Sequence, residues 1–206
     1  MWKKVKGILQ AMNYKINEIF FSLQGEGFNQ GKKVVFIRLS GCNLKCEWCD
    51  TKHDSYKLLS LENIYIEISK YDCRSVIITG GEPTIHNLEP LVKFLKQKQY
   101  WIGLESNGTN NIAHLSKYIN YIAISPKSEI KQLIANEVRI VNDNVDTNKL
   151  LDIERKITAK EYYLSPIDIS GNMNIKETME LLGDINEISN KIWRISLQLH
   201  KFAGIE

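Results

Sequence analysis

Short apolar runs rich in β-branched residues alternate along the chain with segments whose apolar positions have a helical spacing. Runs of the first kind, bounded by Gly, Pro, Asn or Ser, are typical of buried strands. They predict strands over residues 34–40, 75–79, 101–106, 121–125, 138–141, 162–165 and 193–200. The glycine-containing stretch 21–27 comes before the first of these strands.

Three segments show helical periodicity and predict helices. Ser60 can cap a helix over residues 60–71. Pro90 suits the first turn of a second helix, which ends near residue 99. A longer helix is predicted over residues 175–190.

Alternation of strands and helices predicts a mostly parallel sheet with right-handed crossovers. The chain has 206 residues, which is short for eight βα units. We therefore expect an α/β fold that is an abbreviated, partial (β/α) barrel with reduced helices, and an open doubly wound sheet is the alternative. Residues 12–206 would form one domain, and residues 1–11 an N-terminal extension. In either fold, ligands bind at the carboxyl ends of the strands.

The predicted last strand, 193–200, alternates in polarity. Its apolar face contains Trp193, Ile195, Leu197 and Leu199, and its polar face contains Arg194, Ser196, Gln198 and His200. A half-exposed surface strand gives this pattern, and so does a strand whose polar face lines a pocket inside a barrel. The sequence does not decide between the two.

Bulk composition excludes several classes of protein. Hydrophobic residues make up 43% of the chain, enough for a packed core, and the net charge is +3 without a basic cluster. A dedicated nucleic-acid surface is therefore not expected. No apolar run approaches the roughly 18 residues of a membrane span, and the N-terminus lacks the apolar region of a signal peptide. We expect no membrane association and a cytoplasmic protein.

Three of the four cysteines lie in GCNLKCEWCDT, with the spacing Cys42-x3-Cys46-x2-Cys49. In a reducing compartment such clustering indicates metal or redox chemistry. With His53 as fourth ligand, the set could hold zinc. Alternatively, three thiolates could hold a 4Fe–4S cluster with one open iron, which can bind a ligand. Cys73 is remote from the motif and is expected to be a packed residue.

A second motif, Gly80-Gly81-Glu82-Pro83, follows a predicted strand. Its glycines expose backbone groups, and Glu82 could accept from an ammonium group. Alone it could be merely a turn. Together with the cysteine spacing and the aromatic Trp48, it resembles the radical S-adenosylmethionine superfamily. That resemblance implies a barrel of the radical SAM type, with a 4Fe–4S cluster whose open iron chelates S-adenosylmethionine and whose electron generates a 5′-deoxyadenosyl radical.

Further stretches narrow the resemblance. Gln24 and Glu26 offer the donor and acceptors that an amino-pyrimidinone ring requires, and Arg38 offers a fork for a carboxylate. FFSLQGEG, FIRLSGCNLKCEWCDT, TGGEP, ESNGT, SPK and SLQLHKFAGI resemble the 7-carboxy-7-deazaguanine synthase family. Members convert 6-carboxy-5,6,7,8-tetrahydropterin to 7-carboxy-7-deazaguanine with loss of ammonia, on the route to 7-deazapurines such as queuosine. The resemblance also implies a homodimer and a flavodoxin- or ferredoxin-type reductant.

The family pattern implies roles for individual residues. The pterin would be held by Leu23, Gln24, Gly25, Glu26, Arg38, Thr79, His200 and the terminal Glu206. S-adenosylmethionine would be surrounded by Trp48, Cys49, Asp50, Gly81, Glu82, Ser106, Asn107, Ser125, Pro126, Lys127, Ser165 and Asp168. Cys42, Cys46 and Cys49 would ligate the cluster, and Thr51 a magnesium ion.

The mechanism that the resemblance implies starts with hydrogen abstraction from C6 of the pterin. Ring contraction assisted by Mg²⁺ follows, and hydrogen return regenerates S-adenosylmethionine. No side chain acts as a general acid or base. Two positions depart from the family pattern: Ser165, where a glutamine is common, and Glu206, where proline is common at the end.

Two alternatives remain. A glycyl-radical-enzyme activase would share the cysteine spacing and GGEP, but it would need neither Gln24, Glu26 and Arg38 in a pocket nor Thr51 beside the last cysteine. A zinc-stabilised binding module would use His53.

Overall fold

The computed structural model describes residues 13–49, 51–169 and 171–205. One nine-stranded sheet runs through these residues in the order β11-β8-β7-β6-β5-β4-β2-β1-β3. Its strands are β1 (Asn13–Leu23), β2 (Lys33–Leu39), β3 (Lys57–Ser60), β4 (Ser75–Gly80), β5 (Trp101–Ser106), β6 (Tyr121–Ile124), β7 (Glu137–Asn142), β8 (Glu161–Pro166) and β11 (Trp193–Ile195). A small hairpin pairs β9 (Asp168–Ile169) with β10 (Asn172–Met173).

Helices connect most of the parallel strands. The α-helices are α2 (Leu61–Ile68), α3 (Glu89–Gln97), α4 (Thr147–Lys156), α5 (Ile175–Ile188) and α6 (Leu199–Ala203), and the 3₁₀ turns are η1 (Pro83–Ile85) and η2 (Ala113–Leu115). Ser60 accepts from the backbone N–H of Asn63 and caps α2, as its sequence predicts. Within residues 13–49, 51–169 and 171–205, no helix is long and apolar enough to cross a membrane.

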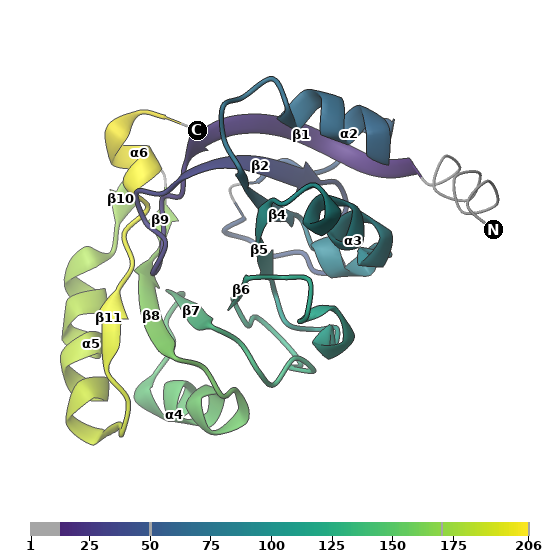
Figure 1. Cartoon of the computed structure of the whole chain (residues 1–206). Coiled ribbons are helices and arrows are strands. Elements are labelled where there is room, and N and C mark those ends of the chain that lie inside the picture. The colour runs from purple at the N-terminus through teal and green to yellow at the C-terminus, as the bar shows by residue number, and fades with distance from the viewer. Residues whose placement is uncertain (1–12, 50, 170, 206) are drawn as a thin grey trace.

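From β2 to β11 all neighbouring strands are parallel, and they follow chain order without a reversal. A doubly wound sheet would reverse its order at a switch point. The expectation of a partial barrel is therefore confirmed, and the doubly wound alternative is wrong. Figure 1 shows the strands as an open arc with α2, α3, α4 and α5 on its outer side.

The loop between β1 and β2 joins the two ends of this arc. Gly27 N–H donates to Ser196 Oγ at 2.9 Å, and Leu199 N–H donates to the Gly25 carbonyl at 3.0 Å. Residues 196–199 follow β11, at the opposite end of the sheet from β1. The loop thereby spans the gap that the missing strands of a full barrel would fill.

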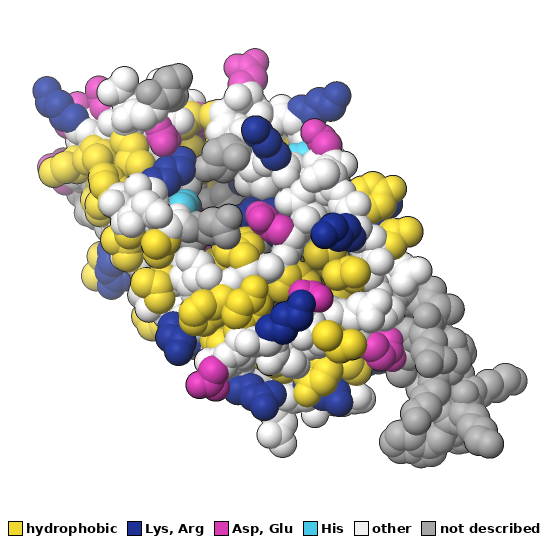
Figure 2. Space-filling model, turned by 90° about the horizontal axis from the view of Figure 1, so that it is seen from above, with side chains coloured by type: hydrophobic (Ala, Val, Ile, Leu, Met, Phe, Trp, Pro, Cys, Tyr) yellow, Lys and Arg dark blue, Asp and Glu magenta, His cyan; other side chains and the backbone are white. Residues whose placement is uncertain are grey.

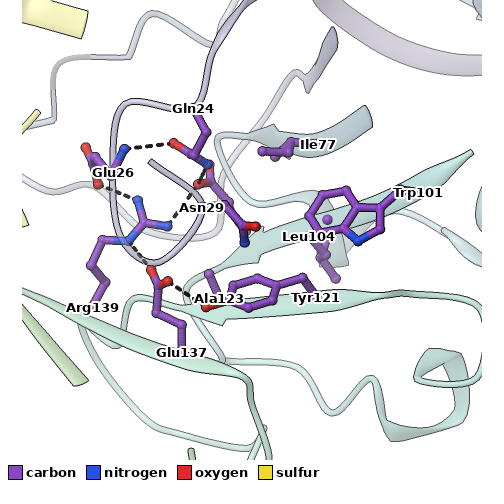
Figure 3. A pocket seen from close by; sticks show the side chains of 12 residues that line it. Gln24, Glu26, Asn29, Ile77, Trp101, Leu104, Tyr121, Ala123, Glu137 and Arg139 are labelled. Carbon is purple, nitrogen blue, oxygen red and sulfur yellow. Dashed lines mark hydrogen bonds and ion pairs between the residues drawn. The ribbon is translucent and has the colours of Figure 1, made fainter. Parts of the chain in front are cut away.

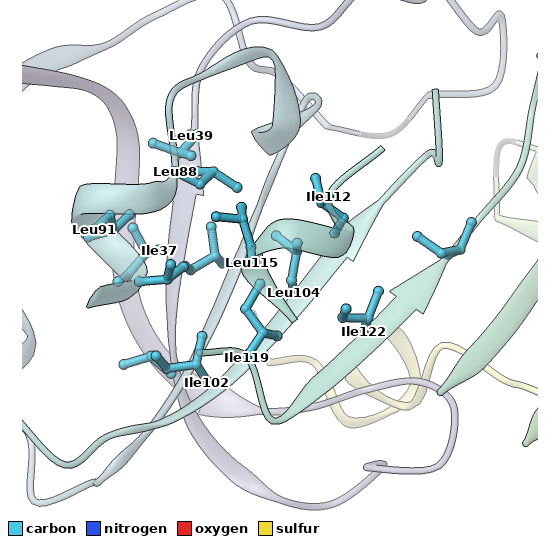
Figure 4. Close-up of a cluster of buried hydrophobic side chains, with 14 of the residues drawn as sticks. Ile37, Leu39, Leu88, Leu91, Ile102, Leu104, Ile112, Leu115, Ile119 and Ile122 are labelled. Carbon is cyan, nitrogen blue, oxygen red and sulfur yellow. The ribbon is translucent and has the colours of Figure 1, made fainter. Parts of the chain in front are cut away.

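Alternation along the strands separates an apolar outer face from an inner face that has both polar side chains and a small apolar cluster around Phe36 and Ile77. Ile37, Ile102 and Leu104 point outward and pack with Leu91 of α3 in the main hydrophobic cluster (Figure 4). The intervening positions face the inside of the arc. These inner positions include Phe36, Arg38, Thr79, Glu105, Glu137 and Arg139.

The strand predicted over residues 193–200 is confirmed at its start, but its predicted length is wrong. The strand ends at Ile195, and α6 begins at Leu199. Leu199 donates its N–H to Gly25 of the β1–β2 loop, so this group does not continue the ladder with β8. Gly204, at φ 64°, then ends α6 in the left-handed conformation that glycine tolerates.

The pattern did not predict β1, β3, α4, α6, the β9–β10 hairpin or the two 3₁₀ turns. Strand β1 buries Tyr14 and Ile16, but most of its other residues are only half-buried, so its alternation is weak. It is stabilised instead by antiparallel pairing on both sides, with β2 and β3. Residues 1–11, expected to form an extension, lie outside the described residues.

Candidate active site

Two connected cavities open at the carboxyl ends of the parallel strands. The larger has a volume of about 510 Å³ and the smaller about 190 Å³. Figure 2 shows the hollow on this face, with a histidine and basic side chains in and around it. Residues common to both walls are Glu26, Thr51, Thr79, Gly80, Glu105, Arg139 and Gln198. The cavities are therefore two ends of one site, called here the cofactor end and the substrate end.

The cysteine loop lines the cofactor end. Cys42 and Cys46 are half-buried and Cys49 is exposed, and all three border the larger cavity. Burial raises the pKa of the Cys46 thiol, while the positive charge of Lys127 acts in the opposite direction. The three cysteines therefore border one space, and Lys127 borders it as well.

The Gly80–Pro83 turn packs directly against the start of the cysteine loop. Glu82 N–H donates to the Gly41 carbonyl at 2.9 Å. A Cβ added to Gly81 would lie 2.3 Å from that carbonyl oxygen and 2.9 Å from Cys42 Cβ. Only glycine fits at position 81, because any side chain would push the two motifs apart.

Glu82 lies behind the cavity wall. It is fully buried, and its carboxylate accepts hydrogen bonds from Ser106 Oγ at 2.8 Å and from Asn107 N–H at 2.6 Å. A further bond comes from Thr84 N–H at 2.9 Å. Ser106 and Asn107 border the larger cavity themselves. The arrangement makes Glu82 an internal brace of this wall, where the sequence predicted an acceptor for a ligand.

Residues after β6 form another part of the cofactor end. Lys127 Nζ donates to Ser125 Oγ at 3.0 Å and lies 5.4 Å from the ring centroid of Trp48. Desolvation lowers the pKa of Lys127. Trp48 donates its indole N–H to Asp143 at 3.0 Å. Pro126 borders a smaller neighbouring cavity, of about 160 Å³, which Trp48 and Lys127 share.

Ser165 and Asp168 complete this end. Ser165 Oγ is buried in the wall and has no hydrogen-bond partner among the described residues. A buried hydroxyl in that state is a group that a ligand can satisfy. Asp168 borders the same cavity and is paired with Lys201 of α6 at 3.2 Å.

The substrate end is lined by polar groups from the β1–β2 loop and the inner sheet face. Gln24 Nε2 donates to Glu105 Oε1 at 3.0 Å, and Thr79 Oγ1 donates to Glu105 Oε2 at 2.9 Å. Arg38 pairs with Glu18 at 2.6 Å. Leu23, Gly25, Glu26 and His200 border the same cavity.

Similarity to known proteins agrees with a site of this kind. Residues 36–148 match the family model described as the radical SAM superfamily. The chain is 47% identical over 203 residues to a 7-carboxy-7-deazaguanine synthase from Haemophilus influenzae, an alignment covering 94% of this chain and 95% of that protein. The chain belongs to the 7-carboxy-7-deazaguanine synthase family of radical SAM enzymes.

Two further members of the synthase family are also similar to this chain over most of its length. A synthase from Neisseria meningitidis serogroup B is 42% identical, with 99% of this chain and 100% of that protein covered. The crystal structure of QueE from Escherichia coli superposes with a TM-score of 0.72 at 27% identity and covers 94% of this chain and 97% of that one. These similarities favour the synthase over the activase and the zinc module.

The family implies a 4Fe–4S cluster and S-adenosylmethionine, and the cofactor end fits both. Its cysteines share one cavity wall, and Gly81 brings the GGEP backbone against them. The cavity volume lies within the few hundred to about 1,000 Å³ usual for cofactor sites. The Ser165 hydroxyl, which has no hydrogen-bond partner among the described residues, lies in the same wall.

Most residues expected at the site of a synthase lie together in the two walls. Asp50 and Glu206 lie outside the described residues. His53 borders the cofactor end, and its carbonyl accepts from Gly41 N–H at 3.0 Å. Thr51 borders both ends.

Sequence reasoning missed Glu105, Arg139 and Gln198, which border both cavities. A signal was available for two of them, because Glu105 and Arg139 are charged residues among apolar neighbours within the predicted strands 101–106 and 138–141. Burial by itself would raise the pKa of Glu105, but Arg139, with the hydrogen bonds of Thr79 and Gln24, outweighs this effect and the pKa is lowered.

Proposed function

We propose that this enzyme converts 6-carboxy-5,6,7,8-tetrahydropterin to 7-carboxy-7-deazaguanine with loss of ammonia, a step toward 7-deazapurines such as queuosine. One observation carries the proposal. A cavity bordered by three cysteines and the GGEP turn opens into a second cavity bordered by Gln24, Glu26 and Arg38. A radical generated at the first end would reach a pterin at the second without crossing bulk solvent.

Cys42, Cys46 and Cys49 would each ligate one iron of the cluster, which leaves the fourth iron for S-adenosylmethionine. When bound, these groups supply a 5′-deoxyadenosyl radical that removes a hydrogen atom from C6 of the pterin. Ser106, Ser125 and Ser165 would hydrogen-bond the cofactor's polar groups. The protein's part is to fix the distance between the two ligands and to exclude water.

The polar groups of the substrate end suit a carboxylated amino-pyrimidinone. Glu26 already accepts from Arg139 and, at 2.9 Å, from Gln198 Nε2. Each carboxylate oxygen has two acceptor sites, so Glu26 can still receive two parallel N–H groups from the pterin. Arg38 and His200, which border the same cavity, would bind the substrate carboxylate.

Incubation of the reconstituted holoenzyme with the carboxy-tetrahydropterin, S-adenosylmethionine, Mg²⁺ and dithionite tests this function. We expect 7-carboxy-7-deazaguanine and ammonia, with no protein partner required. Formation of 5′-deoxyadenosine alone would contradict the proposed substrate. An activase would instead need a second protein to turn over.

We also propose that Thr51 ligates a magnesium ion between the two ligands. Thr51 borders both cavities, and Mg²⁺ accepts a hydroxyl beside substrate oxygens and waters. The ion would neutralise the substrate carboxylate and orient it during ring contraction.

Thr51→Val keeps the shape of the side chain and removes this oxygen. We expect turnover to fall by about 10- to 100-fold and the response to added Mg²⁺ to weaken, because loss of one ligand lowers metal affinity. The matched control is Thr147→Val, a half-buried threonine at the start of α4 that borders neither cavity. An unchanged Mg²⁺ titration in Thr51→Val would refute the assignment.

A flavodoxin- or ferredoxin-type protein would supply the electron to the cluster, and the exposure of Cys49 is consistent with access of such a protein to the cluster.

A homodimer is proposed because the sheet has two edge strands, β3 and β11. Leu58 in β3 and Ile192 beside β11 are apolar side chains that are 57% and 69% exposed. A second copy of the chain that pairs with an edge strand would cover such side chains. Light scattering of the holoenzyme would test the dimer, and a monomer mass would contradict it.

A further inference from the structure

A single arginine ties together three carboxylates beneath the substrate end. Arg139 of β7 donates through Nη1 to Glu26, through Nη2 to Glu105 at 3.0 Å, and through Nε to Glu137 at 2.7 Å. The carboxylates come from the β1–β2 loop, from β5 and from β7 itself. Figure 3 shows Arg139 at the centre of this cluster, with Gln24 and Tyr121 around it.

The cluster is buried as well as charged. Only 11% of the Arg139 side chain is exposed, and Glu137 is 1% exposed. Burial would lower the pKa of Arg139, but Glu137, Glu26 and Glu105 outweigh it and raise this pKa well above its usual value. Buried carboxylates without a cation take up protons instead of remaining charged. Of the three carboxylates, Glu105 shows this effect, because the charge and hydrogen bond of Arg139 help to hold its pKa below the usual value against the opposing effect of burial.

Glu137 connects Arg139 to the backbone of the loop. Its carboxylate accepts from Phe28 N–H at 2.9 Å and from the Tyr121 hydroxyl at 2.8 Å. A Cβ on Gly27 would lie 2.1 Å from Glu137 Oε1, so the loop backbone rests on this carboxylate. The segment that contains Gln24, Gly25 and Glu26 is thus fixed at its far end to β6 and β7.

We propose that Arg139 is the positioning residue of the pterin site: it holds the Glu26 carboxylate in the orientation that receives the amino-pyrimidinone edge of the substrate. This inference rests on the proposed function. Arg139 itself need not touch the substrate. Its planar guanidinium has donors in three directions and can fix the carboxylates relative to one another, which a lysine ammonium cannot do equally well.

The charge of the carboxylates in this cluster matters for recognition of the substrate. An ionised carboxylate accepts two N–H groups of the ring, whereas a protonated one would present a donor to them. Several charged or titratable groups face the cluster from the surrounding elements. They are Glu26 and His200 at the substrate end, Glu105 of β5, Tyr121 of β6, Lys127 after β6, Glu137 of β7 and Tyr163 of β8.

The test is the steady-state kinetics of Arg139→Met holoenzyme with the carboxy-tetrahydropterin between pH 6 and 9. We expect KM to rise by about 10- to 100-fold near pH 7, as for loss of a buried charged hydrogen-bond partner. Without the cation, burial raises the pKa of Glu105, so rising pH should restore the charge of Glu105 and lower the variant's KM. The wild-type KM should stay flat. Arg139→Lys should recover part of the affinity.

Cluster content gives a readout that does not involve the pterin. It should remain at the wild-type level in Arg139→Met, because the three cysteines lie in a separate loop from Arg139. Arg194→Met is the matched control, because Arg194 is half-exposed and pairs with Glu161 outside the cavities. Its KM should not change.

A second variant separates positioning from folding. Glu137→Gln/Arg139→Met removes one charge of each sign, so it should regain stability lost in Arg139→Met while KM stays high. If KM recovers together with stability, or if Arg139→Met keeps the wild-type KM and pH profile, the positioning role is wrong. If the wild type does not turn over the pterin although it cleaves S-adenosylmethionine, the proposed function fails, and this role with it.

Discussion

Replacing Cys46 by alanine should abolish the iron–sulfur cluster and lower turnover by at least about 1,000-fold. Each of the three thiolates ligates a different iron in this family, so two remaining ligands cannot hold the cube with one open position. Cys46 also lies between the other two cysteines and close enough to them for their charges to influence its pKa. The loss should therefore affect the whole cluster and not a single iron.

The measurement is iron and sulfide content after anaerobic reconstitution, with absorbance near about 400 nm, where iron–sulfur charge transfer is observed. Product formation and 5′-deoxyadenosine formation are assayed on the same samples. Both should disappear, because generation of the radical precedes all chemistry on the substrate.

Cys73→Ala is the matched control. Cys73 lies between α2 and β4, where its thiol donates to the carbonyls of Lys33 and Ser75 at 3.4 and 3.5 Å. These are weak bonds on the outside of the site, so cluster content and turnover should be unchanged. Equal loss of iron in both variants would contradict the assignment of Cys46 as a ligand.

Glu82→Ala should lower the free energy of unfolding by about 2–4 kcal/mol. The substitution leaves Ser106 Oγ and the N–H groups of Asn107 and Thr84 without their acceptor in a fully buried place. For a protein of this size the change corresponds to a fall in Tm of about 5–15 °C. Thermal unfolding of the protein without S-adenosylmethionine measures it directly.

Two further variants sharpen this experiment. Glu180→Ala removes a carboxylate that is 66% exposed and should shift Tm very little. Glu82→Gln keeps one acceptor and turns an amide N–H₂ toward donors, so it should fall between wild type and Glu82→Ala. If Glu82→Gln has the wild-type Tm and only weakens binding of S-adenosylmethionine, then Glu82 contacts the cofactor and is not a brace.

The central strands and helices were predictable because each carries its own signal. Strand β5 coincides with its predicted range, and β2, β4, β6, β7 and β8 differ only at their ends. These strands are covered by helices on one side, so β-branched residues recur along them. Strand β1 gave a weak signal since much of it is half-buried.

The C-terminal segment shows why alternation alone can mislead. Residues 193–200 alternate as a strand would, yet the Gly25 carbonyl takes the N–H of Leu199 and the chain turns into α6. The polar residues of this segment therefore lie in different surroundings. Arg194 is exposed, whereas Ser196 is buried and bonded to Gly27, and Gln198 and His200 border the substrate end.

The sequence by itself determined the chemistry of the cofactor end. The spacing of Cys42, Cys46 and Cys49 and the GGEP turn are local in the chain, so nearby residues alone specify them. Tertiary structure decided what depends on distant partners. It put Glu82 behind Ser106 and Asn107, and it joined Arg139 to Glu26 across 113 positions of the chain. A buried charge is stable only beside its partner, and that partner is chosen by how the strands and the loop fold together.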